Sequence, residues 1–506
     1  MPYENTNGNS HGAQRRGERL IIVSNRGPIE HKRDETGSLK RSSSGGGLAN
    51  ALGCAFDGVP VTWIAGAVSD DDRAHAAIDR RLDLANGSAL QLVSPPADAY
   101  RLSYGTFSNA ILWFLQHGLW HRLRRPNIHD EALDAWQRGY LPVNQAFGEA
   151  VAWELRASGA RRVMLHDYHL YAAPLLIRRL QPQAVLQHFI HIPWPGPEAW
   201  SNLPRHIVAA ICEGLLANDS VVFQTTASAQ NFLATCAAYL PDVTIDDAAG
   251  RALRRGRRTR VWANPISVHP GDLEATLSTP AAQSYRERLA APDGMRTIVR
   301  VDRLDPAKNI VAGFRAYDRL LQQHPEWLGH VRFLAFLVPS RTIVPEYRSY
   351  VYEVFSAVDA INRRYGKAGW RPIQVFHEQN RLQALAALTM YDALLVNSIA
   401  DGMNLVAKEG ALVNERDGAL VLSTSAGAFD ELRDGALPVQ PLDVEQTAQA
   451  LHAALTLPAG ERRERAERLR QAVLRHDLDD WLRLLLADLA ATEASREWET
   501  VAAAAP

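Results

Sequence analysis

The stretch between residues 392 and 409 constrains the fold more tightly than any other part of the sequence. It begins with a short apolar run at 392–396, which has the length of a buried strand. Turn and helix-capping residues then break the pattern: Asn397, Ser398, Asp401 and Gly402. Helix-forming residues follow from Met403 onward. The sequence therefore predicts a strand, a tight turn and a helix in direct succession, which is the repeating unit of α/β folds.

This predicted turn has two interpretations. In the functional one, the free N–H groups and the positive end of the helix face one point, and that point suits a phosphate. Asp401 then accepts hydrogen bonds from sugar hydroxyls, and Glu409 reaches a ribose diol. In the structural one, the stretch is an ordinary buried joint whose aspartate caps a helix. The stretch alone leaves both interpretations open.

Strands and helices alternate in both halves of the chain. Short apolar runs predict buried strands at 19–24, 162–165, 184–190, 297–301, 331–337, 374–376, 392–396 and 419–422. Polar loops and helical segments separate these runs, and a seam between the halves lies near Pro265. We therefore predict two Rossmann-like, doubly wound α/β domains that face each other across a cleft.

The predicted domain boundaries follow from this alternation. We expect a disordered leader, an N-terminal Rossmann-like domain, a C-terminal Rossmann-like domain, a closing helix that packs back on the N-terminal domain, and a frayed tail. In the same order, these segments span residues 1–18, 19–264, 265–475, 476–492 and 493–506.

Composition excludes several classes of protein. A chain of 506 residues is too long for one ordinary core, and its net charge of -1 provides no general attraction for nucleic acid or an anionic membrane. The three cysteines are too few and too scattered for a disulfide scaffold, which favours a reducing cytoplasm. No apolar run reaches membrane-spanning length. The arginine-rich run at 251–260 lacks interleaved aromatic residues, so we interpret it as a solvated hairpin.

Polar, titratable residues follow two of the predicted strands, where open α/β sheets bind ligands. We interpret His166 and His169 as structural imidazoles and His191, which precedes a rigid Pro-Trp-Pro segment, as a functional one. Neither histidine cluster has metal-ligand spacing, and we expect no metal. The loop at 42–47 contains three glycines, which suit either a flexible loop or an anion cradle.

Two further groups of residues suit sugar phosphates. Arg303 and Lys308 lie on the exit loop of the strand at 297–301, where both can face a diphosphate. Tyr104 and Trp113 are aromatic residues of a kind that more often lies in a core, but their ring faces also suit the C–H groups of a sugar.

Taken together and in order, these motifs resemble the trehalose-6-phosphate synthase family of retaining GT-B glycosyltransferases over roughly residues 19–490. The resemblance rests on separate motifs: Ser-Asn-Arg ending at Arg26, the glycine loop, residues 104–113, 166–169, 191–193, 303–308 and 340–341, and residues 401–409.

The resemblance implies roles for these residues. Catalysis would involve His191, Arg303, Lys308 and Asp401. The nucleotide-sugar donor would contact Gly47, Arg303, Lys308, Met403, Asn404, Leu405 and Glu409. The sugar-phosphate acceptor would contact Arg26, Trp63, Tyr104, Trp113, Asp167 and Arg341. The acceptor would lie on the N-terminal domain and the nucleotide sugar on the C-terminal domain. Members of the family retain anomeric configuration by front-face attack without a protein nucleophile, so the protein supplies positioning and charge.

Several residues depart from the family pattern. Ala400 stands where an arginine is common, Ser267 and Asn309 replace glycines, and Trp194 replaces a phenylalanine. Some of these features resemble a pseudo-glycosyltransferase branch of the validoxylamine-phosphate-synthase type, which joins a nucleotide-linked cyclitol to an aminocyclitol phosphate. The departures concern the identity of donor and acceptor more than the fold.

The leading hypothesis is a cytoplasmic enzyme that moves glucose from UDP- or GDP-glucose to glucose 6-phosphate, giving α,α-trehalose 6-phosphate. An alternative keeps the fold and uses another phosphorylated acceptor, such as glycerol 3-phosphate or a cyclitol phosphate. A third hypothesis is a non-catalytic sensor of sugar phosphates. We expect no cofactor, no metal, no nucleic-acid partner and no membrane partner. The sequence leaves the base of the donor and the oligomeric state open, a homo-oligomer included.

Overall fold

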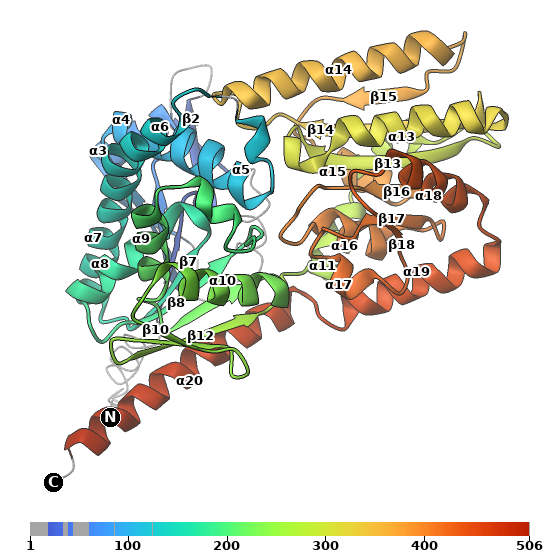
Figure 1. Cartoon of the computed structure of the whole chain (residues 1–506). Helices are drawn as coiled ribbons and strands as arrows, with labels where there is room; N and C mark the ends of the chain where they lie inside the picture. Colours follow the sequence, from blue (N-terminus) through green and yellow to red (C-terminus); the bar gives the residue numbers. More distant parts are fainter. Residues whose placement is uncertain (1–18, 34–38, 44–59, 85–86, 124, 505–506) are drawn as a thin grey trace, which may run out of the picture.

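The computed structural model describes residues 19–33, 39–43, 60–84, 87–123 and 125–504. Residues 44–47 of the glycine loop, Gly47 included, and the whole predicted leader at 1–18 lie outside these residues. Two α/β lobes lie side by side, and the last helix runs from the second lobe back along the first (Figure 1). None of the described helices is both long enough and apolar enough to cross a membrane.

Within the described residues, the first lobe is built on a ten-stranded sheet. In spatial order its strands are β10 (Val243–Asp246), β11 (Arg251–Arg254), β12 (Arg257–Ala263), β9 (Ser220–Phe223), β8 (Val185–Ile190), β7 (Arg162–His166), β1 (Leu20–Ser24), β4 (Val61–Gly66), β6 (Ala89–Val93) and β5 (Arg81–Asp83). From β12 to β6 the neighbours are parallel, with Ile22 of β1 opposite Trp63 and Met164. A separate hairpin pairs β2 (Ile29–Arg33) with β3 (Leu39–Ser43).

The helices of the first lobe cover both faces of this sheet (Figure 1). They are α3 (Asp70–Ile78), α4 (Ala97–Arg101), α5 (Trp113–Gln116), α6 (Ile128–Ala135), α7 (Leu141–Ser158), α8 (Ala173–Leu180), α9 (Arg205–Leu215) and α10 (Thr226–Tyr239). Two π-helical segments, η2 (Leu102–Leu112) and η4 (Trp136–Tyr140), pack on each other. Short 3₁₀ turns complete the lobe: η3 (Trp120–Arg122), η5 (Tyr168–Leu170) and η6 (Ala199–Asn202).

The second lobe is built on a fully parallel sheet that has six strands in the described residues. In spatial order these are β15 (Ile373–Phe376), β14 (Val331–Val338), β13 (Arg296–Arg303), β16 (Ala393–Val396), β17 (Ala419–Ser423) and β18 (Leu437–Val439). Counted from β13, the spatial order is 3-2-1-4-5-6, as in nucleotide-binding doubly wound sheets.

The helices of the second lobe include a long one, α14 (Pro345–Tyr365), at the edge next to β15 (Figure 1). The others are α11 (Pro270–Leu277), α12 (Pro280–Leu289), α13 (Ile310–Gln323), α15 (Arg381–Leu388), α16 (Leu405–Val413), α17 (Phe429–Leu432), α18 (Val444–Thr456) and α19 (Ala459–Leu474). The 3₁₀ turns η7 (Pro306–Lys308) and η8 (Pro325–Trp327) flank α13.

The chain crosses between the lobes twice. Residues 264–268 lead from β12 to α11, and α20 (Leu478–Ala504) returns along the first lobe, where it contacts β8. The two crossings touch, because the Leu478 N–H donates to the Val268 carbonyl over 3.1 Å. Further along α20, Asp488 pairs with Arg260 at 2.5 Å.

The segment expected to be a frayed tail, 493–506, begins within α20, which continues to Ala504. The residues there are mainly alanine and glutamate, which are strong helix formers, so the helix has no local reason to stop. Near the start of this segment Glu493 pairs with Arg162 at 2.7 Å, which holds the helix against the first sheet.

Candidate active site

A cavity of about 1240 Å³ lies between the two lobes. Its walls include most of the predicted site residues: Arg26, Tyr104, Trp113, Asp167, His191, Arg303, Lys308, Arg341, Asp401, Met403, Asn404, Leu405 and Glu409. The predicted donor residue Gly47 lies outside the described residues.

Sheet topology explains why these residues meet. In each lobe the strand order reverses at a central strand, between β1 and β7 in the first lobe and between β13 and β16 in the second. Doubly wound sheets bind ligands beyond the carboxyl ends of the strands at such a reversal. Arg26 and Asp167 follow the first pair of strands, and Arg303 and Asp401 end or follow the second pair. The cavity is therefore the place where two such crevices face each other.

Arg341 is the most heavily contacted cation of the cavity. Its guanidinium donates to the Tyr347 hydroxyl over 2.7 Å and to the Tyr168 hydroxyl over 3.1 Å, and it lies over the Trp113 ring at 3.7 Å. Burial opposes its charge, but these tyrosines and Asp305 outweigh burial, and the pKa of Arg341 lies well above its usual value. The side chain is thus a permanent, fixed positive charge.

Asp305, which the sequence analysis did not select, joins the two lobes at this point. Its fully buried carboxylate pairs with Arg341 at 2.8 Å and accepts a hydrogen bond from Trp113 Nε1 over 3.2 Å. Arg303 lies 3.9 Å from the same carboxylate. Burial alone would raise the pKa of Asp305, but Arg341 and Arg303 hold it below the usual value. The Asp305 carboxylate therefore orients both Arg341, predicted to bind the acceptor, and Arg303, predicted to bind the donor.

Arg26 faces the same end of the cavity from the first lobe. It pairs with Glu30 at 3.0 Å and lies 3.5 Å from the Tyr104 hydroxyl. Tyr104 is carried by the π-helical segment η2, a rare conformation that is frequent at functional sites. Burial would raise the pKa of Tyr104, but Arg26 and Arg341 together lower it below the usual value. The phenol thus lies in a strongly positive part of the cavity.

Asp167 and a group of histidines form the floor of the first lobe's side. The Asp167 carboxylate accepts the His191 backbone N–H over 3.3 Å, and burial raises the pKa of this carboxyl to about 7. His166 Nδ1 lies 3.1 Å from His191 Nε2. Burial, with a contribution from His188, lowers the pKa of His191 to about 3, so its imidazole is neutral.

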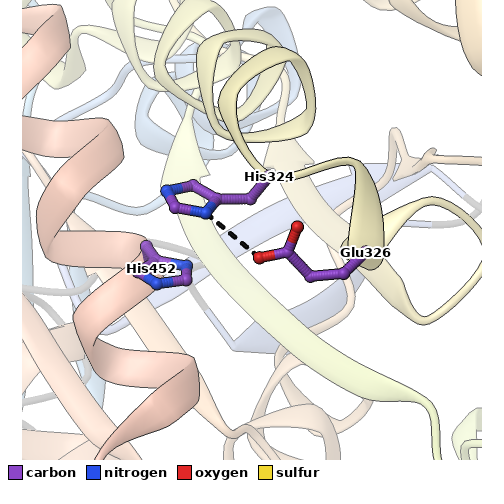
Figure 2. Close-up of side chains that lie close together, drawn as sticks. All are labelled: His324, Glu326 and His452. Atoms are coloured by element: carbon purple, nitrogen blue, oxygen red, sulfur yellow. Dashed lines mark hydrogen bonds and ion pairs between the residues drawn. The ribbon is translucent and has the colours of Figure 1, made fainter.

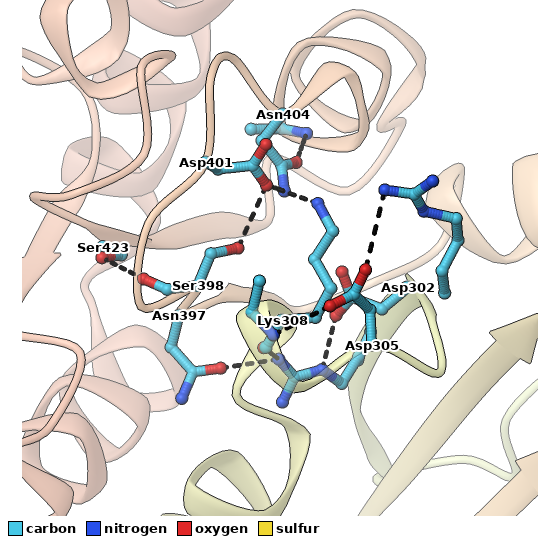
Figure 3. Close-up of polar contacts among 12 residues, drawn as sticks. Asp302, Asp305, Lys308, Asn397, Ser398, Asp401, Asn404 and Ser423 are labelled. Atoms are coloured by element: carbon cyan, nitrogen blue, oxygen red, sulfur yellow. Dashed lines mark hydrogen bonds and ion pairs between the residues drawn. The ribbon is translucent and has the colours of Figure 1, made fainter. Parts of the chain in front are cut away.

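Lys308 and Asp401 form an ion pair on the second lobe's side (Figure 3). The same Asp401 oxygen also accepts hydrogen bonds from Ser398 Oγ over 3.2 Å and Asn404 Nδ2 over 3.0 Å. Burial would raise the pKa of Asp401, but Lys308 and Asn404 keep it below the usual value. A carboxylate with these donors is held in one orientation and is a weak nucleophile.

The turn after β16 is packed closely against the first lobe. A Cβ on Gly402 would lie 1.9 Å from the His191 carbonyl oxygen, and a Cβ on Gly427 would lie 1.9 Å from the Gly402 carbonyl oxygen. The helix begins at Leu405 and not at the predicted Met403, because Asn404 has φ of 86° and its side chain caps the Ala407 N–H. Asparagine tolerates this left-handed conformation better than most residues.

Glu409 lies on α16, one helical turn from the cap. Arg381 is 3.8 Å from its carboxylate. Burial raises the pKa of Glu409 to about 7, with Arg381 acting against burial and Asp272 adding to it. The pKa of Glu409 therefore lies near neutral pH.

Trp63 does not line the cavity. It lies on β4, is 3% exposed and packs in the hydrophobic core. Its Nε1 donates to Ser24 Oγ over 2.8 Å, and Ser24 does line the cavity. Both faces of the strand are covered, so this tryptophan supports the wall and does not form it.

One group of metal-ligand types occurs in the described part of the chain, away from the cavity (Figure 2). The His324 and His452 rings stack at 3.5 Å with an angle of 9° between them, and His324 Nδ1 lies 3.1 Å from Glu326. Stacked rings direct their lone pairs in parallel planes, which do not converge on one ion. Trp327 Nε1 also donates to His452 Nδ1 over 3.2 Å. The group is a stacked imidazole pair beside a carboxylate, and its geometry does not fit a metal.

The family model of glycosyltransferase family 20 matches residues 18–491. The chain belongs to glycosyltransferase family 20. It is therefore a glycosyltransferase, and its two facing lobes are the GT-B arrangement of this family.

Curated relatives of this glycosyltransferase carry two kinds of name. The "Trehalose-6-phosphate synthase" of Mycolicibacterium smegmatis is 34% identical, with 94% of this chain and 92% of the relative aligned. The "Validamine 7-phosphate valienyltransferase" of Streptomyces hygroscopicus subsp. jinggangensis is 30% identical, with 95% and 96% aligned. The chain spans 61% of the length of "Alpha,alpha-trehalose-phosphate synthase [UDP-forming] A" from Dictyostelium discoideum, which is 32% identical over 92% of this chain.

A solved structure of a UDP-forming α,α-trehalose-phosphate synthase from Burkholderia vietnamiensis is similar over nearly the whole fold. The TM-score is 0.80 at 28% identity, with 95% of this chain and 98% of that chain aligned. A related enzyme from Burkholderia xenovorans, solved in complex with glucose 6-phosphate, gives a TM-score of 0.79 at 27% identity, with 93% and 100% aligned.

Proposed function

We propose that this glycosyltransferase moves glucose, with retention of configuration, from a nucleotide sugar to glucose 6-phosphate and forms α,α-trehalose 6-phosphate. The observation that carries the proposal is the meeting of two cationic groups in one cavity. Arg341 and Arg303 both lie over the Trp113 ring, at 3.7 and 5.2 Å, and Asp305 lies between them. Two phosphate-bearing substrates can therefore approach each other there, one from each side.

On the donor side, Lys308 and Arg303 would hold the diphosphate, and the N–H groups of Met403, Asn404 and Leu405 would add to its binding. The left-handed Asn404 directs the start of α16 toward the cavity. Glu409 would accept the ribose hydroxyls. On the acceptor side, Arg26 and Arg341 would hold the 6-phosphate, with Tyr104, Trp113 and Asp167 around the sugar.

The chemistry would follow from this placement. The acceptor's anomeric hydroxyl attacks the donor's anomeric carbon from the face that the diphosphate leaves, and its proton passes to the departing phosphate oxygen. The C–O bond to the diphosphate breaks as the new glycosidic bond forms. Asp401 is a poor candidate for a covalent nucleophile, because Lys308, Ser398 and Asn404 occupy its oxygen. Lys308 and Arg303 would instead stabilise the negative charge on the leaving group.

The test is turnover with defined substrates. Purified enzyme is incubated with UDP-, GDP- or ADP-glucose and glucose 6-phosphate, released nucleoside diphosphate is measured, and the dephosphorylated product is identified by NMR. We expect diphosphate release that depends on the acceptor, and a product with both anomeric centres in the α configuration. Binding of both substrates without release would instead support the sensor hypothesis.

A cyclitol or glycerol phosphate acceptor is the second candidate. Of the departures from the family pattern, Ala400 and Ser267 line the cavity, whereas Trp194 is buried against Trp200 in the core. Asn309 occupies a left-handed position at φ of 57°, and its side chain donates to the Asn397 carbonyl. Only Ala400 and Ser267 thus bear on the choice of substrate. A panel of phosphorylated acceptors, ranked by kcat/KM, separates the two candidates.

A further inference from the structure

We propose that Gln224 is a positioning residue that fixes His191 in one neutral tautomer and couples it to the crossing between the lobes. The expected effect on catalysis rests on the proposed function, whereas the assignment of the His191 tautomer does not. Gln224 follows β9, is 4% exposed and lines the cavity.

The orientation of the Gln224 amide is set by a backbone group. The Ile266 N–H donates to Gln224 Oε1 over 2.8 Å, and a backbone N–H can only donate. The amide nitrogen Nε2 must then be the atom that faces His191 Nδ1, at 3.3 Å. Because Nε2 carries only donor hydrogens, His191 Nδ1 must be the acceptor.

The proton of the His191 ring therefore lies on Nε2. That nitrogen faces His166 Nδ1 at 3.1 Å and donates to it. A second proton, on Nδ1, would point directly at the amide hydrogens of Gln224. The Gln224 amide thus disfavours the imidazolium form of His191, and burial of the ring disfavours the same form.

The same glutamine connects His191 to both lobes. The carbonyl of Ile266, whose N–H binds Gln224, accepts a hydrogen bond from Lys408 Nζ over 3.0 Å. Lys408 is fully buried in the second lobe and pairs with Glu431 at 2.6 Å. The carbonyl of His191 itself lies against Gly402. A change in the angle between the lobes would therefore act directly on the position of His191.

A neutral ring has a chemical advantage at this position. Glycosyl transfer passes through a transition state in which the sugar develops oxocarbenium-like positive charge. An imidazolium beside that sugar would raise the energy of this transition state, whereas a neutral ring does not. By keeping His191 neutral, Gln224 would thus prevent a positive charge beside the reacting sugar.

The decisive variant is Gln224→Glu. A carboxylate has the same shape and still accepts the Ile266 N–H, but its second oxygen cannot donate to Nδ1 and favours a proton there. We expect kcat/KM at pH 7 to fall by about 10–100-fold, which corresponds to about 1.4–2.7 kcal/mol for a misplaced charge at the reacting centre. Activity should recover as the pH rises and His191 loses the added proton. The other titratable groups beside His191 are His166, Asp167 and His188, and Asp401 lines the same cavity; the wild type and the variant share all of them.

A matched variant, Gln224→Met, removes both hydrogen bonds at similar volume. We expect it to lower the melting temperature and to lack the new pH dependence, because it adds no acceptor at Nδ1. The proposal would be overturned if Gln224→Glu lost as much activity as Gln224→Met and its pH–rate profile showed no additional ionisation. Gln224 would then have only a structural role.

The tautomer is also measured without any turnover. In wild-type enzyme labelled with ¹⁵N-histidine, the His191 signals, assigned with His191→Asn, should show an unprotonated Nδ1 and a protonated Nε2. Gln224→Glu should protonate both. The opposite tautomer in the wild-type spectrum would refute the inference whatever the substrates are. This measurement needs only the wild-type enzyme and the His191→Asn variant, so it remains available if the glutamate variant does not fold.

Discussion

The two sides of the cavity are built differently. On the donor side the ion pairs lie within one lobe: Lys308 pairs with Asp401, and Arg381 lies beside Glu409. On the acceptor side the contacts join the lobes. Trp113 of the first lobe donates to Asp305 of the second, and Arg341 of the second donates to Tyr168 of the first.

This difference predicts an order of assembly. A site within one lobe keeps its shape when the lobes separate, whereas a site shared by two lobes exists only when they are together. We therefore expect the donor to bind without the acceptor, and the acceptor to depend on the arrangement of the lobes. Each of the following experiments breaks one side or tests the link between them.

Lys308→Ala should have the largest effect. It removes the positive charge that neutralises Asp401 and that would face the leaving diphosphate. We expect kcat to fall by about 10²–10³-fold, as when one stabilising donor is removed from a transition state. Steady-state kinetics with both substrates measures this, with Arg319→Ala, an exposed arginine paired with Glu445, as the control. A variant with normal kcat would contradict the donor-side assignment.

Arg341→Ala should break the acceptor side alone. The loss of a charge-assisted hydrogen bond costs about 1.5–3 kcal/mol, so we expect the KM for glucose 6-phosphate to rise by roughly 10–100-fold. The Kd of the nucleoside diphosphate, measured by calorimetry, should stay within about twofold, because the ion pairs of Lys308 and Glu409 do not involve Arg341, which reaches Arg303 through Asp305 and Trp113. Equal weakening of both ligands would show that the two sides are not separable.

Asp305→Asn tests the link between the sides. It keeps the shape but removes the charge that orients Arg341, and we expect the KM for the acceptor to rise by about tenfold, or about 1.4 kcal/mol. Trp113→Phe removes the indole N–H donor to the same carboxylate and shortens the ring under Arg341. The two changes should be non-additive by about 0.5–3 kcal/mol in a double-mutant cycle, since they remove one shared contact. Strict additivity would mean that the contact between the lobes does not contribute.

The smallest effect should be a pH dependence of donor binding. The Glu409 pKa of about 7 lies above the ordinary value, so the carboxyl is protonated below neutral pH and offers both oxygens as charged acceptors to the ribose hydroxyls only above it. The affinity for the nucleoside diphosphate should therefore increase as the pH rises through 7. Calorimetry between pH 6 and pH 8 measures this, and Glu409→Gln should flatten the profile. An equally steep profile in the variant would assign the titration to another group.

Local sequence patterns were sufficient for most of the second lobe. The apolar runs at 331–337 and 419–422 differ from β14 and β17 by a single residue at one end. Helix propensity alone placed the start of α16 at Met403, two residues early, because propensity does not reveal the left-handed conformation of Asn404, whose side chain caps the Ala407 N–H.

Local sequence patterns could not predict contacts between residues that are far apart in the chain. Gln224 and Ile266 are 42 positions apart, and Trp113 and Asp305 are 192 positions apart, so no local period connects them. Asp305 had one usable signal, since it lies in the same loop as Arg303 and Lys308. Trp63 was given to the acceptor site only by the family resemblance, but its strand is covered on both faces.

The two crossings between the lobes meet at a single place, where Leu478 binds Val268 and Asn264 binds the Trp481 carbonyl. Two adjacent connections permit the lobes to swing about one pivot but resist a twist about the connecting axis. Opening would then separate the acceptor wall from its partner and, because Gln224 binds Ile266 beside the pivot, would also shift the position of His191. Removal of α20 would leave residues 264–268 as the one remaining connection between the lobes. The lobes could then twist freely, and the acceptor site that they share would no longer be held together.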